Sequence, residues 1–540
     1  MKSFTVMAMA ASVASVMLML SGRSVVEAVP PVPKAWGSNQ PNGHPLGALQ
    51  RMYGNPGYHI AVAESPRAYF TTTVDQESGY VVFAEKDADG FLQPSPYKVG
   101  VNSTDDMAGI IEPKLKESTE VVQMKCMAND YCAWKSKNNG LSGSPPPTGE
   151  FKNLVLPFRF FNHSAREMNL AELAEDTFND DHISVKDYFT EQSFGKLTVA
   201  SEFADLVELS MTEKECSDNV SGTSKKLHEC LLEVVNQTTY TIADYHMVTF
   251  IHSGVAAEWG QRDNQHNYYD DRIWSHAWEL DMPDGTKLPY AITSAFFGFS
   301  FDKIQHVGVP VHEIAQVIGA PTMYGNYPGM GLGLYDVMAS PYGFDTRLHH
   351  CGSFSAYTKV YMEWVDVEEI TEDGTYTAKA GDTKVYKISK GFPVGEYLYI
   401  ENRQNTGYDA SLMGPGLAIY HVDETADNVV GYPAQGEEEG SGNFPTSHYR
   451  VSIIQADGSY DLEQMEDDGD ATDLFHHFGV DGITPDGPLI AGQPDETLAY
   501  PNTNGYAEGK LVDTGLVIKD ISAPGEEMQF TVVFSEASSA

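Results

Sequence analysis

Positive charge is scarce in this chain of 540 residues. Only 34 side chains are Lys or Arg, against 76 Asp or Glu, so the formal net charge is −42 with neutral histidines. A protein that binds nucleic acid needs a basic face to displace counterions from phosphates, and anionic membrane surfaces attract the same kind of face. The composition therefore argues against both partners. Disorder is not indicated, because 41% of the residues are hydrophobic, which is enough for sizeable cores in two to four domains.

Long apolar runs are absent after the N-terminus. The one such stretch, Phe4 to Leu20, follows Lys2 and precedes Val26-Glu27-Ala28, a small-residue pattern suited to signal-peptidase cleavage. The stretch is short for a membrane anchor, and no second run of about 20 apolar residues follows. We therefore predict a cleaved signal over residues 1–28 and a secreted, extracellular protein with no membrane contact. Triplets compatible with N-glycosylation, which also arise by chance, lie at Asn102, Asn162, Asn219 and Asn236.

Cysteine is rare as well, with five in the chain. No Cys-x-x-Cys pair exists, so neither a thiolate zinc ribbon nor a thioredoxin-type site is expected. Two local disulfides, Cys126 with Cys132 and Cys216 with Cys230, together with a free thiol at Cys351, form the simplest scheme. The spacing alone does not prove this connectivity.

The pattern along the chain predicts an α+β fold. Short strands and turns fill residues 29 to about 135, and a Pro-, Gly- and Ser-rich linker follows at 136–150. Buried strands are predicted at 154–161 and 247–252, and helices at 165–178, 184–189 and 307–319. Strands dominate again from about residue 375, at 397–401, 416–421, 449–454 and 528–534.

The most informative segment is the predicted helix at 307–319. Pro310 suits its first turn, and Gly319 ends it. The helix carries His312 followed by Glu313. In zincin peptidases, a His-Glu pair on a helix begins the metal site, with a second His one turn later; the Glu takes a proton from the metal-bound water.

Two positions in this segment depart from the zincin pattern. Gln316 stands where the second histidine belongs, and Thr322 stands where the longer form of the motif has its third ligand. Taken alone, the fragment also fits an ordinary buried helix with one polar edge. The surrounding sequence decides between these interpretations.

The chain resembles the immune inhibitor A family of secreted zinc metallopeptidases over nearly its whole length after the signal. The family's run H-E-x-G-H-x-x-G-x-P-D-x-Y aligns on residues 312–324. Other similar segments are Asn153-Leu-Val-Leu, Ser184-Val-Lys-Asp-Tyr-Phe, Ile273-Trp-Ser-His-Ala-Trp, Gly333-Leu-Tyr-Asp-Val-Met, Glu401-Asn-Arg-Gln and Gly416-Leu-Ala-Ile-Tyr-His. The order and spacing of these segments carry the resemblance.

The resemblance implies a zincin-like metallopeptidase core at 149–368, an N-terminal pro-like region at 29–148 and a β-rich C-terminal region at 369–540. His312 would then bind zinc, Glu313 would act as the general base and Met338 would lie beneath the metal. The substrate would be an extracellular protein or peptide. His276 and His421 fall in matching segments and are candidates for the edge of the cleft.

The departures fall where the metal would be held. A Gln carbonyl oxygen is a neutral, hard donor that suits calcium better than zinc, and Thr is a poor zinc ligand. Losing one His ligand should cost several kcal/mol of zinc affinity, since even changes outside the ligand shell cost roughly tenfold to hundredfold. His306 precedes the helix, and His349 and His350 fall in a predicted surface loop. None of the three is a good replacement ligand.

Two hypotheses therefore stay open. The first is a metalloendopeptidase that cleaves extracellular proteins with a metal-bound water, provided that the site still binds zinc. The second is a catalytically inactive pseudoprotease that binds peptides or proteins.

Calcium is a second candidate ion. Acidic turns at 87–90, 264–271 and 466–473 supply the clustered oxygens that calcium prefers, although none has the complete EF-hand spacing. At 87–90 and 466–473, ordinary solvated turns are the favoured interpretation, with calcium as the alternative.

Overall fold

The computed structural model describes most of the chain after the predicted linker. The described residues are 146–218, 225–259, 271–298, 301, 303–324, 331–343, 351–426, 450–464, 467–490, 501–507 and 510–535, and towards the N-terminus 27–28, 49–55, 58–64, 69–74, 80–87, 91–99, 101–102 and 110. Helices and strands are both present and strands predominate, which confirms the α+β prediction.

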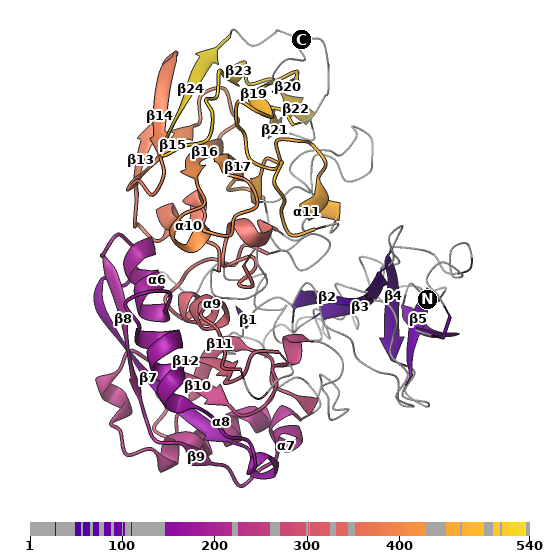
Figure 1. Ribbon diagram of the computed structural model, residues 1–540, viewed down its shortest axis with the longest axis vertical. Helices are drawn as coiled ribbons and strands as arrows, with labels where there is room; N and C mark the ends of the chain where they lie inside the picture. Colours follow the sequence, from indigo (N-terminus) through magenta and orange to yellow (C-terminus); the bar gives the residue numbers. More distant parts are fainter. Residues whose placement is uncertain are drawn as a thin grey trace, which may run out of the picture.

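A seven-stranded sheet forms the centre of the first large part (Figure 1). Its order is β1-β11-β12-β10-β7-β8, with β9 also paired to β7. Strands β12, β10, β7 and β8 run parallel, whereas β11 is antiparallel to β12 and β1 is antiparallel to β11. The strands are β1 (Glu27–Ala28), β7 (Gly149–Arg159), β8 (Leu197–Phe203), β9 (Val207–Glu208), β10 (Met247–His252), β11 (His276–Asp281) and β12 (Lys287–Ser294).

Helices cover both faces of this sheet. Along β7, Val155 faces the core that includes α6 (Val185–Gln192) and α9 (Gly308–Val317), while Leu154 and Leu156 face α8 (Lys225–Gln237). Burial on both faces explains why β7 is almost continuously apolar in sequence. The other helices are α5 (Leu170–Glu172), α7 (Glu213–Ser217) and α10 (Ala356–Tyr361), with one-turn helices at η1 (Phe161–His163), η3 (Ile242–Asp244), η4 (Ala257–Trp259) and η6 (Gly333–Tyr335).

The second large part is a pair of five-stranded sheets. One has the order β13-β15-β16-β17-β18 and the other β14-β24-β23-β19-β20. Leu398 and Ile400 of β16 pack with Phe530 of β24 between the sheets, while Tyr397 and Tyr399 join the core that contains α9. This alternation follows from the period of two in a strand, and it makes the largest core continuous across residue 369.

The elements of this second part have the following bounds. They are β13 (Asp366–Glu369), β14 (Gly374–Lys379), β15 (Lys384–Ile388), β16 (Glu396–Arg403), η7 (Gly407–Asp409), β17 (Gly416–Asp423), β18 (Val451–Ile453), α11 (Asp461–Gln464), β19 (Val480–Thr484), β20 (Gly487–Ile490), β21 (Gly505–Ala507), β22 (Lys510–Val512), β23 (Leu516–Lys519) and β24 (Glu527–Phe534).

A fourth sheet lies in the N-terminal region. It is antiparallel in sequence order, from β2 to β6, and lies to one side of the two larger parts (Figure 1). Its strands are β2 (Leu49–Asn55), β3 (Tyr58–Glu64), β4 (Tyr69–Val74), β5 (Val81–Lys86) and β6 (Leu92–Lys98).

One predicted helix is wrong in its bounds. The helix expected at 165–178 begins only at α5 and continues as a π-helix, η2, over Leu173–Asn179. Asn169 accepts a hydrogen bond from the Glu172 N–H and so caps α5, which leaves residues 165–168 outside it.

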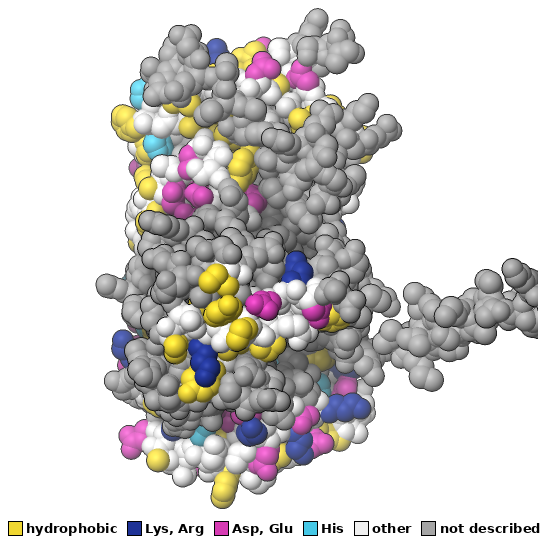
Figure 2. Space-filling view, turned by 90° about the vertical axis from the view of Figure 1, so that its right-hand side faces the viewer, with side chains coloured by type: hydrophobic (Ala, Val, Ile, Leu, Met, Phe, Trp, Pro, Cys, Tyr) yellow, Lys and Arg dark blue, Asp and Glu magenta, His cyan; other side chains and the backbone are white. Residues whose placement is uncertain are grey.

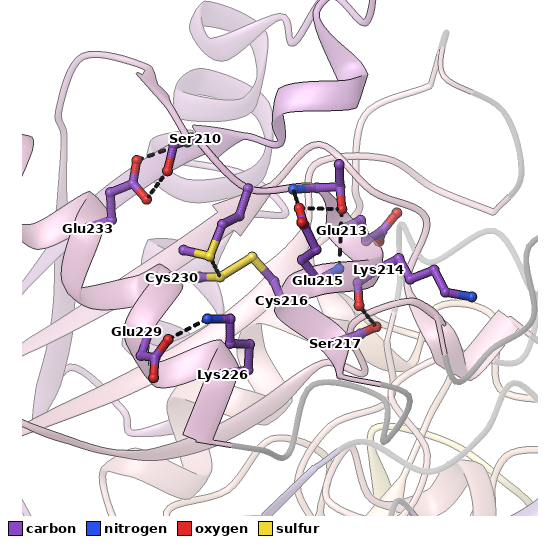
Figure 3. The surroundings of a disulfide bond; sticks show 12 residues. Ser210, Glu213, Lys214, Glu215, Cys216, Ser217, Lys226, Glu229, Cys230 and Glu233 are labelled. Atoms are coloured by element: carbon purple, nitrogen blue, oxygen red, sulfur yellow. Dashed lines mark hydrogen bonds and ion pairs between the residues drawn. A yellow bond between two sulfur atoms is a disulfide. The ribbon is translucent and has the colours of Figure 1, made fainter.

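The disulfide Cys216–Cys230 is present and links α7 to α8 (Figure 3). Thr212 and Glu215 form a capping box that begins α7, so Cys216 is held facing α8. Cys351 is a buried free thiol, as predicted, whereas Cys126 and Cys132 lie outside the described residues.

On the face drawn in Figure 2, acidic and basic side chains are scattered among apolar and neutral ones. Within the described part of the chain, no helix is both long and apolar enough to cross a membrane.

Candidate functional site

The predicted site helix is α9, and it is deeply buried. Val307 stands at its N-cap without a side-chain cap, Pro310 lies in the first turn, and Gly319, at φ 98°, follows its end. His312 and Glu313 are 0% exposed and Gln316 is 1% exposed. The polar edge of α9 therefore lies inside the core, although the sequence prediction expected a cleft.

Both ring nitrogens of His312 are hydrogen-bonded. Nδ1 lies 2.7 Å from the carbonyl oxygen of Val337, which can only accept, so Nδ1 carries the proton. Burial lowers the pKa of His312 to about 4, so the ring is neutral and Nε2 offers a lone pair. The ring also stacks on Tyr324, with the centroids 5.9 Å apart.

Gln316 is the hydrogen-bond donor to this lone pair. Its Nε2 lies 2.9 Å from Nε2 of His312, one helical turn earlier, and donates a hydrogen bond to it. The amide cannot be reversed here, because its oxygen would then face an acceptor nitrogen. Gln316 Oε1 is buried and has no hydrogen-bond partner within the described residues. The residue at the second-ligand position thus binds the first-ligand histidine directly.

Glu313 lies among buried phenols that the sequence did not single out. Its carboxylate adds to the effect of burial in raising the pKa values of Tyr290 and Tyr342. Glu258 also raises the pKa of Tyr342. Burial raises the pKa of Glu258 itself to about 7. The Ser275 hydroxyl donates to Glu258 at 2.6 Å. Only the tertiary structure brings these residues together, since Tyr290, Tyr342 and Glu258 lie outside the quoted motifs.

Met338 follows Val337, whose carbonyl binds His312. Its N–H donates to Oδ1 of Asp336 at 2.8 Å, and its carbonyl accepts from the Met323 N–H at 3.0 Å. Thr322 is half-buried and immediately precedes Met323. The segments around Thr322 and Met338 therefore meet beside α9.

Asp336 fixes the turn that carries Val337 and Met338. It is fully buried, and its Oδ2 accepts from the hydroxyls of Ser355 and Thr358, each at 2.6 Å. Burial raises the pKa of Asp336, and these hydrogen bonds oppose that rise. The carboxylate thus joins the turn to the start of α10.

His276 lies on β11, the strand next to the edge of the large sheet. It is fully buried, its Nδ1–H donates to the Trp274 carbonyl at 2.7 Å, and its Nε2 lies 3.0 Å from the Tyr290 hydroxyl. Burial lowers its pKa to about 4. β1 pairs with β11 at this point, with Ala28 opposite His276, and also contacts α9. The outer edge of β11 thus accepts an extended strand beside the site helix.

His421 faces away from α9. Its neighbours Tyr420 and Val422 pack in the core with Ile314 of α9, so the alternation along β17 directs His421 to the opposite face. There its ring contacts Tyr506, with centroids 5.6 Å apart. His421 is therefore not placed to bind a metal with His312.

The other candidate histidines do not complete a metal site either. His306 packs on Phe297 before α9 begins. His349 and His350 lie outside the described residues. Among the described residues, no His-containing group of three or more ligand side chains converges closely enough to hold a metal ion.

Acidic side chains do converge at 457–473. The carboxylates of Asp457, Asp470 and Asp473 offer oxygens that all lie within 4.8 Å of one another. Burial, with Asp470 and Asp457 nearby, raises the pKa of Asp473 to about 8. Of the other predicted acidic turns, 88–90 and 264–270 lie outside the described residues.

No protein-family model matches the chain, and no curated protein matches it.

Proposed function

We propose that this chain is a secreted, immune inhibitor A-type metallopeptidase-like protein that binds extended peptides without hydrolysing them through zinc. The contact between Gln316 and His312 carries the proposal. It places an amide donor on the nitrogen lone pair that a zinc ion would need.

The residues around His312 do not fit a catalytic zinc. Such sites have three protein ligands, drawn from His, Cys, Asp and Glu, and an open position for water. Here both nitrogens of His312 are engaged, the next position is an amide and the third is a threonine.

Peptide binding is supported by the edge of β11. β1 occupies this edge with Glu27 opposite Ala277 and Ala28 opposite His276. Signal cleavage after Ala28, as the sequence predicts, would remove β1 and leave the edge open. An added peptide strand would satisfy the exposed backbone groups, which is the basis of recognition by β-augmentation.

Calcium is proposed as a structural ion at 457–473, in the second large part. Three carboxylates within 4.8 Å of one another supply hard oxygen ligands. The loop also contacts the segment under α9, since the Tyr335 hydroxyl donates to Oδ2 of Asp473 at 2.8 Å. A bound cation would therefore support the shape of the site without acting in it.

Zinc content and casein hydrolysis of the protein lacking residues 1–28 test the proposal together. We expect less than 0.1 zinc per chain and no chelator-sensitive cleavage, on the order of a hundredfold or more below an intact site. Gln316→His with Thr322→Asp should gain zinc. Stoichiometric zinc in the natural chain, with cleavage abolished by Glu313→Ala, would instead establish the active peptidase.

Fluorescence anisotropy with labelled casein peptides tests the binding function separately. We expect saturable binding, with competition from a synthetic peptide of residues 22–30, which contains β1. Binding without competition would place the peptide elsewhere on the protein. Absence of binding by all of the casein peptides would contradict the peptide-binding proposal.

A further inference from the structure

A cavity of about 390 Å³ lies where α6 and α10 meet β14, β15 and β16. Figure 1 shows α6 and α10 at the junction of the two large parts. A volume of about 300–1,000 Å³ and a position between two structural parts are both typical of small-ligand sites. The cavity is separate from α9, so its interpretation does not depend on the proposed function.

Phe194 is held in an unusual conformation at the wall of this cavity. It follows the C-cap of α6 with φ 56°, in the left-handed region where glycine is normally found. In this region the Cβ atom of any residue but glycine comes close to the following carbonyl oxygen. The backbone is fixed by the Phe194 N–H, which donates to the Glu191 carbonyl at 3.0 Å, and by Gly195 at φ 76°. Strain of this kind at a cavity wall points to a function of the side chain.

Two ion pairs line part of the cavity. Lys359 Nζ lies 2.8 Å from Oε2 of Glu401, and Arg403 binds Asp409 through two nitrogens at 2.6 and 2.7 Å. Arg403 is 2% exposed and Glu401 8%. These charges are fixed in place by their partners, so they form a preorganised polar surface.

The charges of the whole lining balance. Its cations are Lys359, Lys379, Lys384 and Arg403, and its anions are Glu191, Asp382, Glu401 and Asp409. The two remaining lysines are paired as well, Lys379 with Glu527 and Lys384 with Glu368, each at 2.8 Å. Within the described residues, no ion pair joins Glu191 or Asp382 to a cation, whereas an anionic ligand would have to break one of the four pairs. A neutral ligand rich in hydroxyl groups could donate to Glu191 and Asp382 while leaving the four pairs intact.

One amide oxygen adds an acceptor beside the aromatic ring. Gln192 and Asn402 line the cavity with both ends of each amide hydrogen-bonded within the protein, and Gln404 donates to Asn402 Oδ1 at 2.7 Å, which leaves Gln404 Oε1 for a ligand. The half-buried Phe194 ring for C–H groups, next to Gln404 Oε1 and the carboxylates of Glu191 and Asp382 for hydroxyls, matches the chemistry of a pyranose ring. We propose that this cavity binds a neutral saccharide of one or two units.

Binding of sugars to the protein lacking residues 1–28, measured by saturation-transfer NMR and calorimetry, tests the proposal. The neutral probes are glucose, N-acetylglucosamine, maltose, cellobiose and chitobiose, and the charged probes are glucuronate, glucosamine and glycine. We expect at least one neutral probe to bind with one site per chain. Phe194→Gly should weaken it at least about tenfold, because glycine keeps the backbone conformation and removes only the ring.

Phe161→Ala is the matched control, because Phe161 is 67% exposed and outside the cavity lining. It should leave the affinity unchanged. If Phe194→Gly does not fold, Gln404→Leu provides the second variant and should also weaken binding. Failure of every neutral probe to bind, binding of charged probes alone, or an affinity unchanged in the folded cavity variant would each overturn the proposal.

Discussion

The side-chain amide of Gln316 donates a hydrogen bond to Nε2 of His312 across 2.9 Å, one turn along α9. The same histidine donates from Nδ1 to Val337, so its ring is satisfied at both nitrogens inside the core. Gln316 thus supplies the partner that the buried lone pair of His312 would otherwise lack. The hydrogen bond is coherent with the burial of both side chains.

Gln316→Leu should destabilise the protein by about 1–3 kcal/mol, because it leaves the buried Nε2 lone pair of His312 without a donor. Urea unfolding at pH 7 measures the change. Gln237→Leu at the exposed end of α8 is the control and should shift stability by less than about 0.5 kcal/mol. Equal effects of the two substitutions would show that the hydrogen bond contributes nothing to stability.

Buried neutral histidines should make the protein sensitive to acid. Burial lowers the pKa values of His252, His276 and His312 to about 3, 4 and 4. In the unfolded chain a histidine binds its proton near pH 6.5, so the unfolded state gains protons first as pH falls. Each histidine's contribution to the free energy of unfolding is therefore present above about pH 6.5. It is lost progressively as the pH falls from there to the pKa of the folded state.

His252→Asn isolates one of these contributions. The Asn oxygen can replace Nδ1 as the acceptor for the Gly254 N–H, which lies at 3.1 Å, and the amide does not titrate. Between pH 7 and 4.5 the variant should lose roughly 2–3 kcal/mol less stability than the natural chain, as measured by urea unfolding. Identical losses in the two proteins would mean that His252 is not held neutral.

A buried carboxyl pair should give the opposite pH dependence in the second large part. Burial, aided by hydrogen bonding to Asp423, raises the pKa of Glu396 to about 8. The folded state then keeps a proton that the unfolded chain releases near pH 4.5. The contribution of Glu396 to the free energy of unfolding is thus full below about pH 4.5 and is lost as the pH rises to about 8.

Glu396→Gln should remove this dependence, because the amide can donate to Asp423 and accept from Tyr506 without titrating. The Tyr506 N–H lies 2.8 Å from Oε2 of Glu396, so its hydrogen-exchange protection reports on the pair. Protection should fall between about pH 4.5 and 8 in the natural chain and stay constant in the variant. The same decline in both proteins would exclude Glu396 as its cause.

Local sequence patterns predicted the elements around the site better than the contacts within it. The strand at 247–252 and the helix at 307–319 were predicted nearly as found, since β-branched apolar runs and a Pro-to-Gly apolar stripe are local signals. The interpretation of Gln316 was incomplete, because its hydrogen bond depends on the tautomer that Val337 imposes on His312 from 25 residues away. The orientation of His421 likewise depends on which face of β17 meets α9. Such facts require the tertiary structure.

Calcium should stabilise the protein through the carboxylates at 457–473. Asp457, Asp470 and Asp473 repel one another, and Asp473 keeps a proton up to about pH 8. A divalent cation would displace that proton and remove the repulsion, which adds about 2.7 kcal/mol to the free energy of unfolding at a concentration one hundred times its dissociation constant.

Millimolar calcium should therefore raise the melting temperature more at pH 8 than at pH 6. Asp470→Asn should abolish most of the rise, while Asp205→Asn, at an exposed position between β8 and β9, should preserve it. A melting temperature that calcium leaves unchanged at both pH values would identify these residues as an ordinary acidic turn.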